Sequence, residues 1–348
     1  MQAKCGLFFT SYRQESQFFP SCFQKGSLAV FLVLLAIAPF LMETFIISIL
    51  NLILIAVIGA VGLNILTGAC GQISLGHGAF IGVGAYASGL ATQSGIPFPL
   101  ALILGGTAAA ATGMIFGIPS LRLKGIYLAI ATLAAQLILE YVFLHWDAFT
   151  GGANGMLLDS PSILGISFDT EQRMYWLILT IAIICVLAGA NVMRTKAGRA
   201  FVAIRDFHLS AEIAGVNLFQ YKIYAFGISS FMAGVAGCLW GHYTMYIAPE
   251  QFNIGLSISY LAMIVIGGMG KILGSIMGAV FVTLLPELLN SVASFIGVWF
   301  PDISSSILAL REGTFGLVLV LFLIFEPEGL AHRWRLIKAY WKLYPFAH

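Results

Sequence analysis

Charged residues are scarce in this chain, and their scarcity excludes most classes of soluble protein. Asp, Glu, Lys and Arg together make up 9% of the 348 residues, whereas about a quarter of an ordinary soluble domain is charged. So few charges cannot cover the surface of a soluble enzyme of this length. Positive and negative residues nearly balance, at 17 and 15. No basic stripe stands out, so we expect no nucleic-acid partner.

The chain also lacks the motifs of catalytic and metal-binding sites. Its histidines are scattered, without the HExxH spacing of zinc hydrolases, at positions 77, 145, 208, 242, 332 and 348. Its five cysteines form no CxxC pair, which favours free, buried thiols. Gly270 and Lys271 are similar to the end of a phosphate-binding loop, but Val265 and Ile272 stand where that loop requires Gly and Ser or Thr. We therefore expect no enzyme activity, no metal and no cofactor on this chain.

Apolar residues take up 59% of the sequence, which excludes a disordered chain and predicts a polytopic membrane protein. A membrane-spanning helix needs about 20 apolar residues. We predict an all-α bundle of about ten transmembrane helices, with a small surface helix at 303–310 before the last one. The predicted spans are 28–42, 45–66, 77–93, 99–118, 125–146, 174–193, 223–246, 252–269, 272–290 and 313–326.

The distribution of Lys and Arg sets the direction of these spans, because cytoplasmic loops carry an excess of positive charge. With the N-terminus in the cytoplasm, ten crossings place 15 of the 17 positive residues inside and only Arg173 and Arg311 outside. The expected organisation is a cytoplasmic N-terminal segment at 1–27, a transmembrane domain at 28–330 and a basic tail at 331–348. Both termini are therefore predicted to be cytoplasmic.

The segment 67–90, TGACGQISLGHGAFIGVGAYASGL, is rich in Gly, Ser, Gln and His although it lies between apolar runs. Non-helical backbone at membrane depth is tolerated only where it is buried in protein or lines a cavity. Gln72, Ser74 and His77 would be costly against lipid. We interpret the segment as part of a translocation pathway or as an interruption of the helix. Such an interruption is either a re-entrant segment or a broken helix. Close packing inside a bundle explains it equally well.

Two further features of the predicted spans bear on function. Glu140 and Glu287 are carboxylates inside apolar stretches, which makes them functional candidates unless they lie near a span end and reach water. Small residues recur at four-residue spacing, as at Gly270, Gly274 and Gly278. This spacing lets helix backbones approach closely in lipid, so we predict a tightly packed bundle.

The loop 194–222 is the longest one predicted in the cytoplasm, and it has the pattern of short amphipathic helices. Asp206 is suited to cap the second helix, and Gly215 to end it in the left-handed conformation. Glu212 falls in the last turn, where the helix dipole disfavours an anion by roughly 0.3–1 kcal/mol. We interpret the segment as a docking helix whose Glu212 meets a positively charged partner. The alternative is a helix on the membrane surface.

Several segments carry a resemblance to a known family. They are 62–89 (GLNILTGACGQISLGHGAFIGVGAYASG), 121–134 (LRLKGIYLAIATLA), 146–156 (WDAFTGGANGM), 199–222, 267–279 (GGMGKILGSIMGA) and 284–289 (LLPELL). They closely resemble the branched-chain amino acid ABC importer permeases, and SYRQES near the N-terminus resembles the LivM-type subunit. The chain departs from the family pattern at Glu328, where the family's usual residue is basic, and this leaves the local contact at the cytoplasmic exit open.

This resemblance implies a subunit of an ATP-driven importer of leucine, isoleucine and valine in the cell inner membrane. Such a permease lies in the lipid bilayer beside a second, H-type permease. Two ABC ATPase subunits bind the ATP below it, and a periplasmic or extracellular amino-acid-binding protein docks above. The segment 199–216 is similar to the coupling loop of ABC importers, with Ala211, Glu212 and Gly215 at matching positions.

The residue types and the resemblance together name three sets of candidate residues. Contact with the ATPase is expected of the coupling-loop residues Arg199, Arg205, Asp206, Ala211, Glu212 and Gly215. The candidates for the translocation pathway are Gln72, Ser74, His77, Gly78, Glu140, Thr150, Gly151, Gly152 and Asn154. The candidates for helix packing are Gly270, Gly274 and Gly278.

Other functions stay open at this point. A urea permease, or another small-amide or amino-acid permease of the same family, shares most of these motifs, although 146–156 favours the amino-acid branch. A stand-alone secondary transporter or channel is disfavoured by the structured 194–222 loop. A structural membrane subunit of an enzyme complex would leave that loop and the Gly-rich segment unexplained.

The charge distribution generates a topological prediction. Cysteines introduced at Asp159 and at Lys196 are expected to react with a membrane-impermeant maleimide from opposite sides, Asp159 from outside and Lys196 only after the membrane is opened. The unsubstituted chain is the reference for labelling of the native cysteines. Reaction of both positions from the same side would contradict the ten-span topology.

Overall fold

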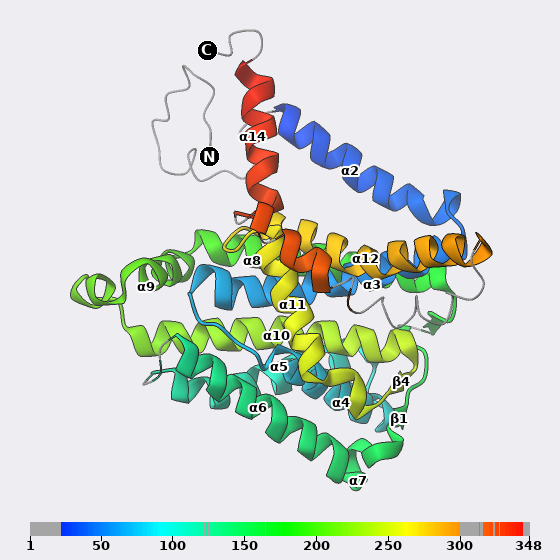
Figure 1. Ribbon diagram of the computed structural model, residues 1–348. Helices are drawn as coiled ribbons and strands as arrows, with labels where there is room; N and C mark the ends of the chain where they lie inside the picture. Colours follow the sequence, from blue (N-terminus) through cyan, green and yellow to red (C-terminus); the bar gives the residue numbers. More distant parts are fainter. Residues whose placement is uncertain are drawn as a thin grey trace. The chain divides into compact units, whose positions relative to one another are not determined.

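The computed structural model describes residues 22–121, 123, 125–163, 165–299, 313, 316–322, 324–326 and 328–343 (Figure 1). The contacts between residues divide the chain into two units, Met1–Ser48 and Ile49–His348. The first unit contains α2, Cys22–Leu41, and the first residues of α3, Thr44–Leu63. The other described elements belong to the second unit, which carries the candidate site.

The described chain is almost entirely helical, and seven of its helices are long and apolar enough to cross a membrane. An all-α, multi-pass membrane protein is therefore confirmed. The seven are α3 with the π-helix η1 that continues it (Asn64–Ala69), α5 (Phe98–Gly117), α6 (Ile126–His145), α8 (Glu171–Arg194), α10 (Leu218–Thr244), α11 (Ile254–Gly267) with the short helix η4 before it (Pro249–Phe252), and α12 (Ile272–Trp299).

The predicted number of ten spans is not confirmed. α4 (His77–Gln93) forms where the sequence predicts the third span, but it has only 17 residues. The apolar part of α2 is limited to Ala29–Leu41. The last predicted span, 313–326, lies partly outside the described residues, and the predicted surface helix at 303–310 lies wholly outside them.

α4 is short because it lies inside the bundle rather than against lipid. It packs against α5 and α10, and most of its residues are buried. Glycine permits this packing, because a Cβ on Gly84 would lie 2.6 Å from the carbonyl carbon of Gly234 on α10. The Cys238 thiol on α10 donates to the Gly84 carbonyl oxygen at 3.2 Å. α4, α5 and α10 therefore form the centre of the second unit (Figure 1).

Short elements lie at the ends of the long helices. They are η2 (Ile118–Leu121), α7 (Asp147–Thr150), η3 (Gly152–Asn154), β1 (Met156–Leu157), β2 (Ser162–Ile163), β3 (Ile166–Ser167), α9 (Lys196–Ile213), β4 (Tyr246–Ile247) and α14 (Leu330–Leu343). β1 pairs antiparallel with β4, with Met156 opposite Ile247, and β2 pairs antiparallel with β3, with Ser162 opposite Ser167. The first pair ties the loop after α7 to the end of α10.

Polar caps set where α8, α9, α10 and α11 begin. The first N–H groups of a helix have no partner inside it, and Ser, Thr, Asp and Asn side chains are the usual acceptors. Each of these helices starts after such a residue, whose side chain accepts from the backbone N–H three positions on: Thr170, Thr195, Asn217 and Asn253.

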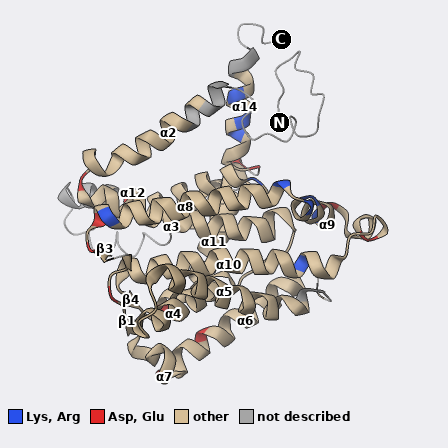
Figure 2. Ribbon diagram, turned by 180° about the vertical axis from the view of Figure 1, so that it is seen from behind, with Lys and Arg blue, Asp and Glu red and all other residues tan. Residues whose placement is uncertain are grey.

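Charged residues lie mainly at the ends of the helices (Figure 2). Lys and Arg gather around α9, α14 and the start of α10, whereas both signs occur near β3 at the opposite end. There Asp169 accepts hydrogen bonds from Ser160 and Ser167, which lower the pKa of its carboxyl. The distribution is the one that the positive-inside rule expects, and the orientation itself stays a prediction. Five of the positive residues used for it lie outside the described residues: Lys4, Arg13, Arg122, Lys124 and Arg311.

The glycines at 270, 274 and 278 lie where α12 meets α11. A Cβ on Gly274 would lie 2.7 Å from the carbonyl oxygen of Gly267, and a Cβ on Gly278 would lie 3.0 Å from the Gly267 nitrogen. Gly270 has a φ of +79° in the turn between the two helices. The helices therefore meet backbone against backbone, which small residues at this spacing permit.

We expect Gly274→Ala to lower the thermal stability of the purified protein, because the added methyl group faces backbone atoms that cannot rotate away. Overpacking of this kind costs about 1–3 kcal/mol. Gly227→Ala is the matched control, since the Cβ of this buried helical glycine would face the flexible side chain of Met114 at 3.2 Å. Equal melting temperatures for Gly274→Ala and the wild type would contradict the backbone contact.

Candidate functional site

The helical backbone is interrupted between α3 and α4. α3 passes directly into η1, which has the wider turn of a π-helix and ends at Ala69. Gly71 follows with a φ of +72°, and the backbone N–H of Gln72 donates to the Leu66 carbonyl oxygen at 3.1 Å. Regular helix resumes at His77. The Gly-rich segment is thus a break between two helices, and π-helical turns are frequent at functional sites.

The first N–H groups of α4 are bonded by side chains from two other helices. Gly78 N donates to Ser257 Oγ on α11 at 2.7 Å, and Ala79 N donates to Gln136 Oε1 on α6 at 2.8 Å. Gln136 also accepts from Ser257 Oγ at 3.1 Å and donates to the Phe252 carbonyl oxygen at 2.5 Å. Gln136 and Ser257 therefore cap α4 from other helices, and we call these two residues the α4 cap.

The polar side chains of the break are buried in this part of the bundle. Gln72, Ser74 and His77 are at most 8% exposed. His77 Nε2 donates to the Gly59 carbonyl oxygen on α3 at 3.0 Å, and its ring meets that of Tyr260 edge-on. These side chains are enclosed by protein in this conformation. Their place in a translocation pathway stays a prediction.

The two carboxylates inside predicted spans are half-buried. Glu140 lies on α6 one turn beyond Gln136. Glu287 lies on α12, and its carbonyl oxygen accepts from the Ser291 hydroxyl at 2.9 Å. In the contacts that the structure describes, neither carboxylate joins the polar group around the break.

The remaining pathway candidates form the loop after α6. The Thr150 hydroxyl donates to the Phe143 carbonyl oxygen at 2.7 Å and accepts from Gly152 N at 3.2 Å, which closes the end of α6. Asn154 is exposed, and its carbonyl oxygen accepts from the Tyr246 hydroxyl at 3.0 Å. About 14 Å of α6 separates this loop from the α4 cap, at 1.5 Å per residue. The structure therefore places 72–78 together and Thr150, Gly151, Gly152 and Asn154 at another depth.

A second polar group joins η1 to α9 and to the turn between α11 and α12. Asn64 bonds two groups of that turn and one of α12: Oδ1 accepts from Gly270 N at 2.7 Å, and Nδ2 donates to Lys271 O at 2.8 Å and to Ser275 Oγ on α12 at 2.6 Å. At the other end of η1, Arg205 Nη1 on α9 donates to the Gly68 carbonyl oxygen at 3.0 Å. We call Asn64 and Arg205, with the groups they bind, the η1 link.

The predicted coupling loop is α9, and it consists of two helical pieces. Phe207 lies between them with a φ of −158° and a ψ of 97°. The Asp206 carboxylate accepts from Arg205 Nε at 3.0 Å and Nη2 at 2.9 Å, so it orients that guanidinium. Arg199 is exposed on the first piece, and its Nη1 donates to the Arg194 carbonyl oxygen at 3.3 Å.

The second piece of α9 ends as the sequence predicts. Gly215 has a φ of +84°. Gly215 N donates to Glu212 O and Val216 N donates to Ala211 O, both at 2.9 Å. These two bonds form the Schellman motif. Glycine is favoured in it because the residue after the helix adopts the left-handed conformation, in which a side chain would be strained. The direction in which the chain leaves this helix is therefore set by Gly215.

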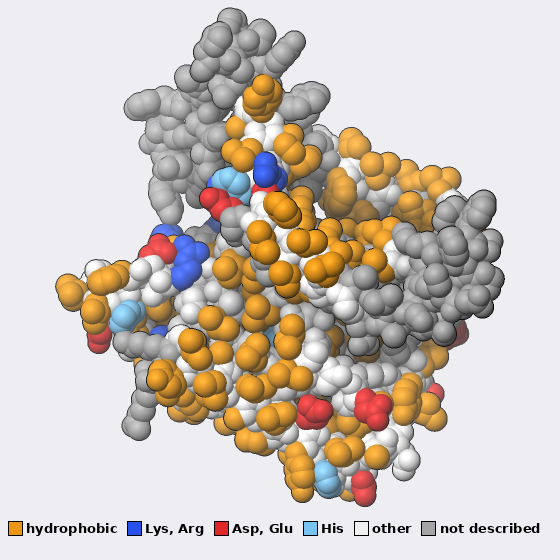
Figure 3. Space-filling model, viewed as in Figure 1, with side chains coloured by type: hydrophobic (Ala, Val, Ile, Leu, Met, Phe, Trp, Pro, Cys, Tyr) orange, Lys and Arg blue, Asp and Glu red, His pale blue; other side chains and the backbone are white. Residues whose placement is uncertain are grey.

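The α9 tip, which we define as residues 207–216, exposes apolar side chains beside charged ones. Ile213 is 88% exposed, and Phe207 and Leu209 are more than half exposed. Figure 3 shows apolar side chains at this end of α9, next to acidic and histidine side chains. Ala211 is buried on the inner side. The exposed surface of the tip is therefore partly apolar and partly polar.

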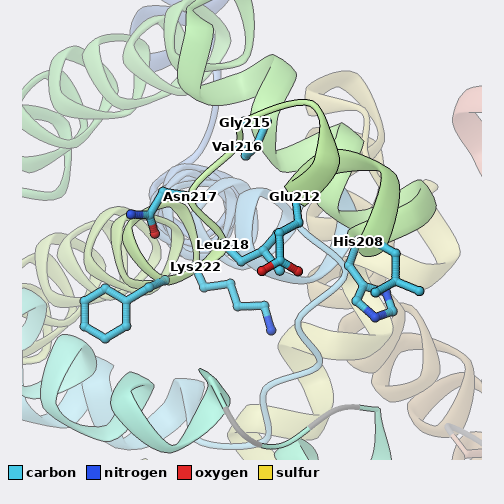
Figure 4. A pocket seen from close by; sticks show the side chains of 9 residues that line it. His208, Glu212, Gly215, Val216, Asn217, Leu218 and Lys222 are labelled. Atoms are coloured by element: carbon cyan, nitrogen blue, oxygen red, sulfur yellow. The ribbon is translucent and has the colours of Figure 1, made fainter.

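A pocket of about 630 Å³ lies between the α9 tip and the start of α10. Its lining includes Glu212 and His208 from the tip and Lys222 from α10. Figure 4 shows the Glu212 carboxylate and the Lys222 ammonium pointing into the same space. The anion at the unfavourable helix end therefore shares its pocket with a cation of the same chain.

The departure from the family pattern at Glu328 is accommodated inside the chain. Gly329 has a φ of +77°, and a Cβ on it would lie 2.6 Å from the Cα of Gly268, so the start of α14 packs on the turn after α11. Two side-chain contacts of 2.5 Å are formed within this segment: Glu328 Oε2 lies against His332 Nδ1, and Glu326 forms an ion pair with Arg333.

Comparison with known proteins identifies the family. The family model described as "Branched-chain amino acid transport system / permease component" matches residues 45–324. The chain belongs to this permease family. It is 30% identical over 332 residues to the high-affinity branched-chain amino acid transport system permease protein LivM of Escherichia coli K12, a match that covers 88% of this chain and 75% of that protein.

Other permeases match over most of the chain. LivM of Salmonella typhimurium is also 30% identical, with 88% of this chain and 75% of that protein covered. The autoinducer 2 import system permease protein LsrC of Escherichia coli DH10B is 28% identical, with 73% of this chain and 71% of that protein covered. No solved structure matches the chain. The resemblance to the LivM-type subunit is confirmed. The match to LsrC shows that a relative named for a different import is also similar over most of the chain.

The sequence analysis did not predict the residues of this permease that form hydrogen bonds around the break between α3 and α4. Gln136, Ser257 and Asn64 lie inside apolar helices, and a polar side chain in an apolar run is itself a signal. Inside the regular spans, the sequence analysis considered only the carboxylates Glu140 and Glu287, and these three side chains are neutral. A third group was missed in the same way: Asn51 Nδ2 and the Tyr243 hydroxyl each donate to Glu171 Oε2 at 3.0 Å.

Replacement of the α4 cap tests whether the break depends on it. We expect Gln136→Leu to lower the melting temperature of the permease, because it leaves the buried N–H of Ala79 without its acceptor, at a cost of about 1–3 kcal/mol. Gln93→Leu is the control, since Gln93 is exposed and bonds only an exposed carbonyl of Leu157 at 3.1 Å. If both variants melt at the same temperature, Gln136 does not support the break.

Proposed function

We propose that this permease is the LivM-type subunit of an ATP-driven importer that moves leucine, isoleucine and valine across the cell inner membrane. The family match and the two LivM relatives support the substrate class. In this proposal a second, H-type permease completes the pathway, two ABC ATPases bind from the cytoplasm, and an amino-acid-binding protein delivers the substrate from outside. Both termini lie in the cytoplasm.

The observation that carries the coupling part of the proposal is the α9 tip. Ile213, Phe207 and Leu209 are exposed on a segment with fixed geometry, since the Schellman motif at Gly215 sets its end. Exposed apolar residues rimmed by polar ones mark interaction surfaces. A docked protein would cover these apolar side chains and would also contact Glu212, which is exposed beside them.

A membrane-surface helix accounts less well for the same segment. Such helices are amphipathic, with a long apolar face and Lys or Arg on the polar face. The second piece of α9 covers only 208–213, and its exposed charged residue is the anion Glu212. It offers little apolar area to a bilayer and the wrong charge for anionic lipid. Docking to a protein is therefore the better account.

Transport follows from a difference in affinity between two states. The chain has no phosphate-binding loop, so the energy is assigned to ATP bound by the partner subunits. ATP binding closes the ATPase pair and moves α9, and the bundle then opens to the other side. A partner shifts such an equilibrium only by its differential affinity for the two states. In this proposal the ATPase binds the α9 tip with different affinities in the two states.

The substrate is tested by uptake into proteoliposomes that contain the complete complex. We expect labelled leucine, isoleucine and valine to accumulate when ATP is present on the ATPase side. Other amino acids, urea and autoinducer 2 are the comparison substrates, because relatives and family resemblance raise them as alternatives. Uptake of urea or autoinducer 2 in preference to leucine would overturn the substrate class. Uptake independent of ATP would identify a stand-alone transporter.

Two substitutions at the α9 tip test coupling. Gly215→Val is expected to reduce stimulation of ATPase activity by the loaded binding protein at least tenfold, because a β-branched residue resists a φ of +84°. Among the described residues other than the two chain neighbours, no atom would lie within 4 Å of the new Cβ, so the expected effect is on the backbone. Gly215→Asn is the matched control, since Asn tolerates this conformation and should keep most of the stimulation.

Glu212→Arg reverses the charge of the tip and should weaken coupling more than folding, because an exposed ion pair contributes only about 0–1 kcal/mol to stability. Glu212→Gln separates loss of the charge from its reversal. The permease pair should still assemble in every variant. Full stimulation and uptake with both Gly215→Val and Glu212→Arg would mean that the tip is only a surface helix.

A further inference from the structure

We propose that the η1 link positions the helix break for transport: Arg205 transmits the movement of α9 to η1, and Asn64 passes it on to the turn between α11 and α12. This inference rests on the proposed function, because it assumes that α9 is moved by an ATPase. It names residues, contacts and a direction of coupling that neither the family match nor the relatives supply.

The first step of the link is the contact between α9 and η1. The last carbonyl groups of a helix have no partner inside it, and a cation is favoured at this end. Arg205 meets both conditions, since its Nη1 donates to the Gly68 carbonyl oxygen at 3.0 Å. Gly71 keeps the same space open, because a Cβ there would lie 3.0 Å from Arg205 Cγ.

The guanidinium is held in one orientation by its neighbour. Arg205 Nε and Nη2 both donate to Asp206 Oδ1, at 3.0 and 2.9 Å, which leaves Nη1 directed at η1. Asp206 stands at the kink of α9, directly before Phe207. A change of angle at the kink therefore changes the direction of the guanidinium, and movement of the tip reaches η1 through it.

The second step is the contact between η1 and the α11–α12 turn. Asn64 uses both atoms of its amide on this turn and on the start of α12, with bonds of 2.6–2.8 Å to Gly270, Lys271 and Ser275. Gly270 N also lies so close to Gly68 that no Cβ fits on Gly68. η1 and the turn are therefore held together at both ends of the π-helix, and they move as one body.

The third step is the π-helix itself. Its wider turn leaves it one local rearrangement away from an α-helix, and such turns recur at functional sites. The residues that follow it are the break that contains Gln72, Ser74 and His77. Since interfaces and packed cores switch between discrete arrangements rather than deform continuously, a shift of η1 between two registers moves the break as a unit.

The experiment measures transport and the state of the break in the same complexes. Arg205→Ala and Asn64→Ala are each expected to reduce ATP-dependent leucine uptake at least tenfold, and the double variant no further, because both remove one link. Arg205→Lys should retain the larger part of the wild-type uptake, since we expect a lysine ammonium also to reach the Gly68 carbonyl oxygen. Lys196→Ala is the control, as it removes an exposed cation from the same helix outside the link.

The native Cys70 reports on the break directly, because it is fully buried and follows η1. Its alkylation by N-ethylmaleimide, followed by mass spectrometry, should differ at least threefold between the nucleotide-free complex and the complex with a non-hydrolysable ATP analogue. In Arg205→Ala the two rates should be equal. A merely structural role for Arg205 would change both rates together and leave their ratio as in the wild type.

The outcomes separate the two proposals. Wild-type uptake that does not depend on ATP would overturn the proposed function and the link with it. ATP-dependent wild-type uptake that Arg205→Ala and Asn64→Ala leave intact would overturn the link alone. Additive losses in the double variant, or a nucleotide response of Cys70 that persists in Arg205→Ala, would also overturn the link.

Discussion

Every backbone polar group at membrane depth must find a partner inside the protein, and the break between α3 and α4 must meet this requirement without the hydrogen bonds of a continuous helix. The interruption frees carbonyl groups at the end of η1 and N–H groups at the start of α4. Arg205 takes up the first, and the α4 cap takes up the second. Three helices other than α3 and α4 are thereby committed to one segment: α6, α9 and α11.

Glycine has a complementary part in the same arrangement. α4 reaches the centre of the bundle because Gly84 and Gly234 bring its backbone against that of α10. The turn after α11 reaches η1 because Gly68 and Gly270 carry no side chain there. In a lipid environment helix association is driven by close packing and hydrogen bonds rather than by the hydrophobic effect. At η1 and the α11–α12 turn, close approach and polar satisfaction are therefore achieved together.

The sequence predicted the helices well, because apolar runs of about 20 residues have few other solutions. It also predicted the glycine stop at Gly215, since that depends on local chain geometry alone. The role of Arg205 was foreseen only as part of a loop that meets an ATPase. Its bond to Gly68 joins residues that are 137 positions apart, and such a pairing depends on tertiary packing. The same holds for Gln136 and Ser257, whose polarity is visible in the sequence but whose partners are not. The count of ten spans is not confirmed, and α4 shows a related reason. A helix that is buried among other helices has no need of the length or hydropathy that lipid requires.

The through-space cap of α4 also sets an order of events during synthesis. The N-terminus of α4 is made before both of its acceptors, and Ser257 follows Gly78 by 179 residues. Until α6 and α11 have been made, those N–H groups lack the acceptors that they have in the folded protein. α4 is also short and rich in glycine, so it gains little from contact with lipid by itself. The cap of α4 is therefore complete only after α11 has been made, which places the closure of this part of the bundle late in synthesis.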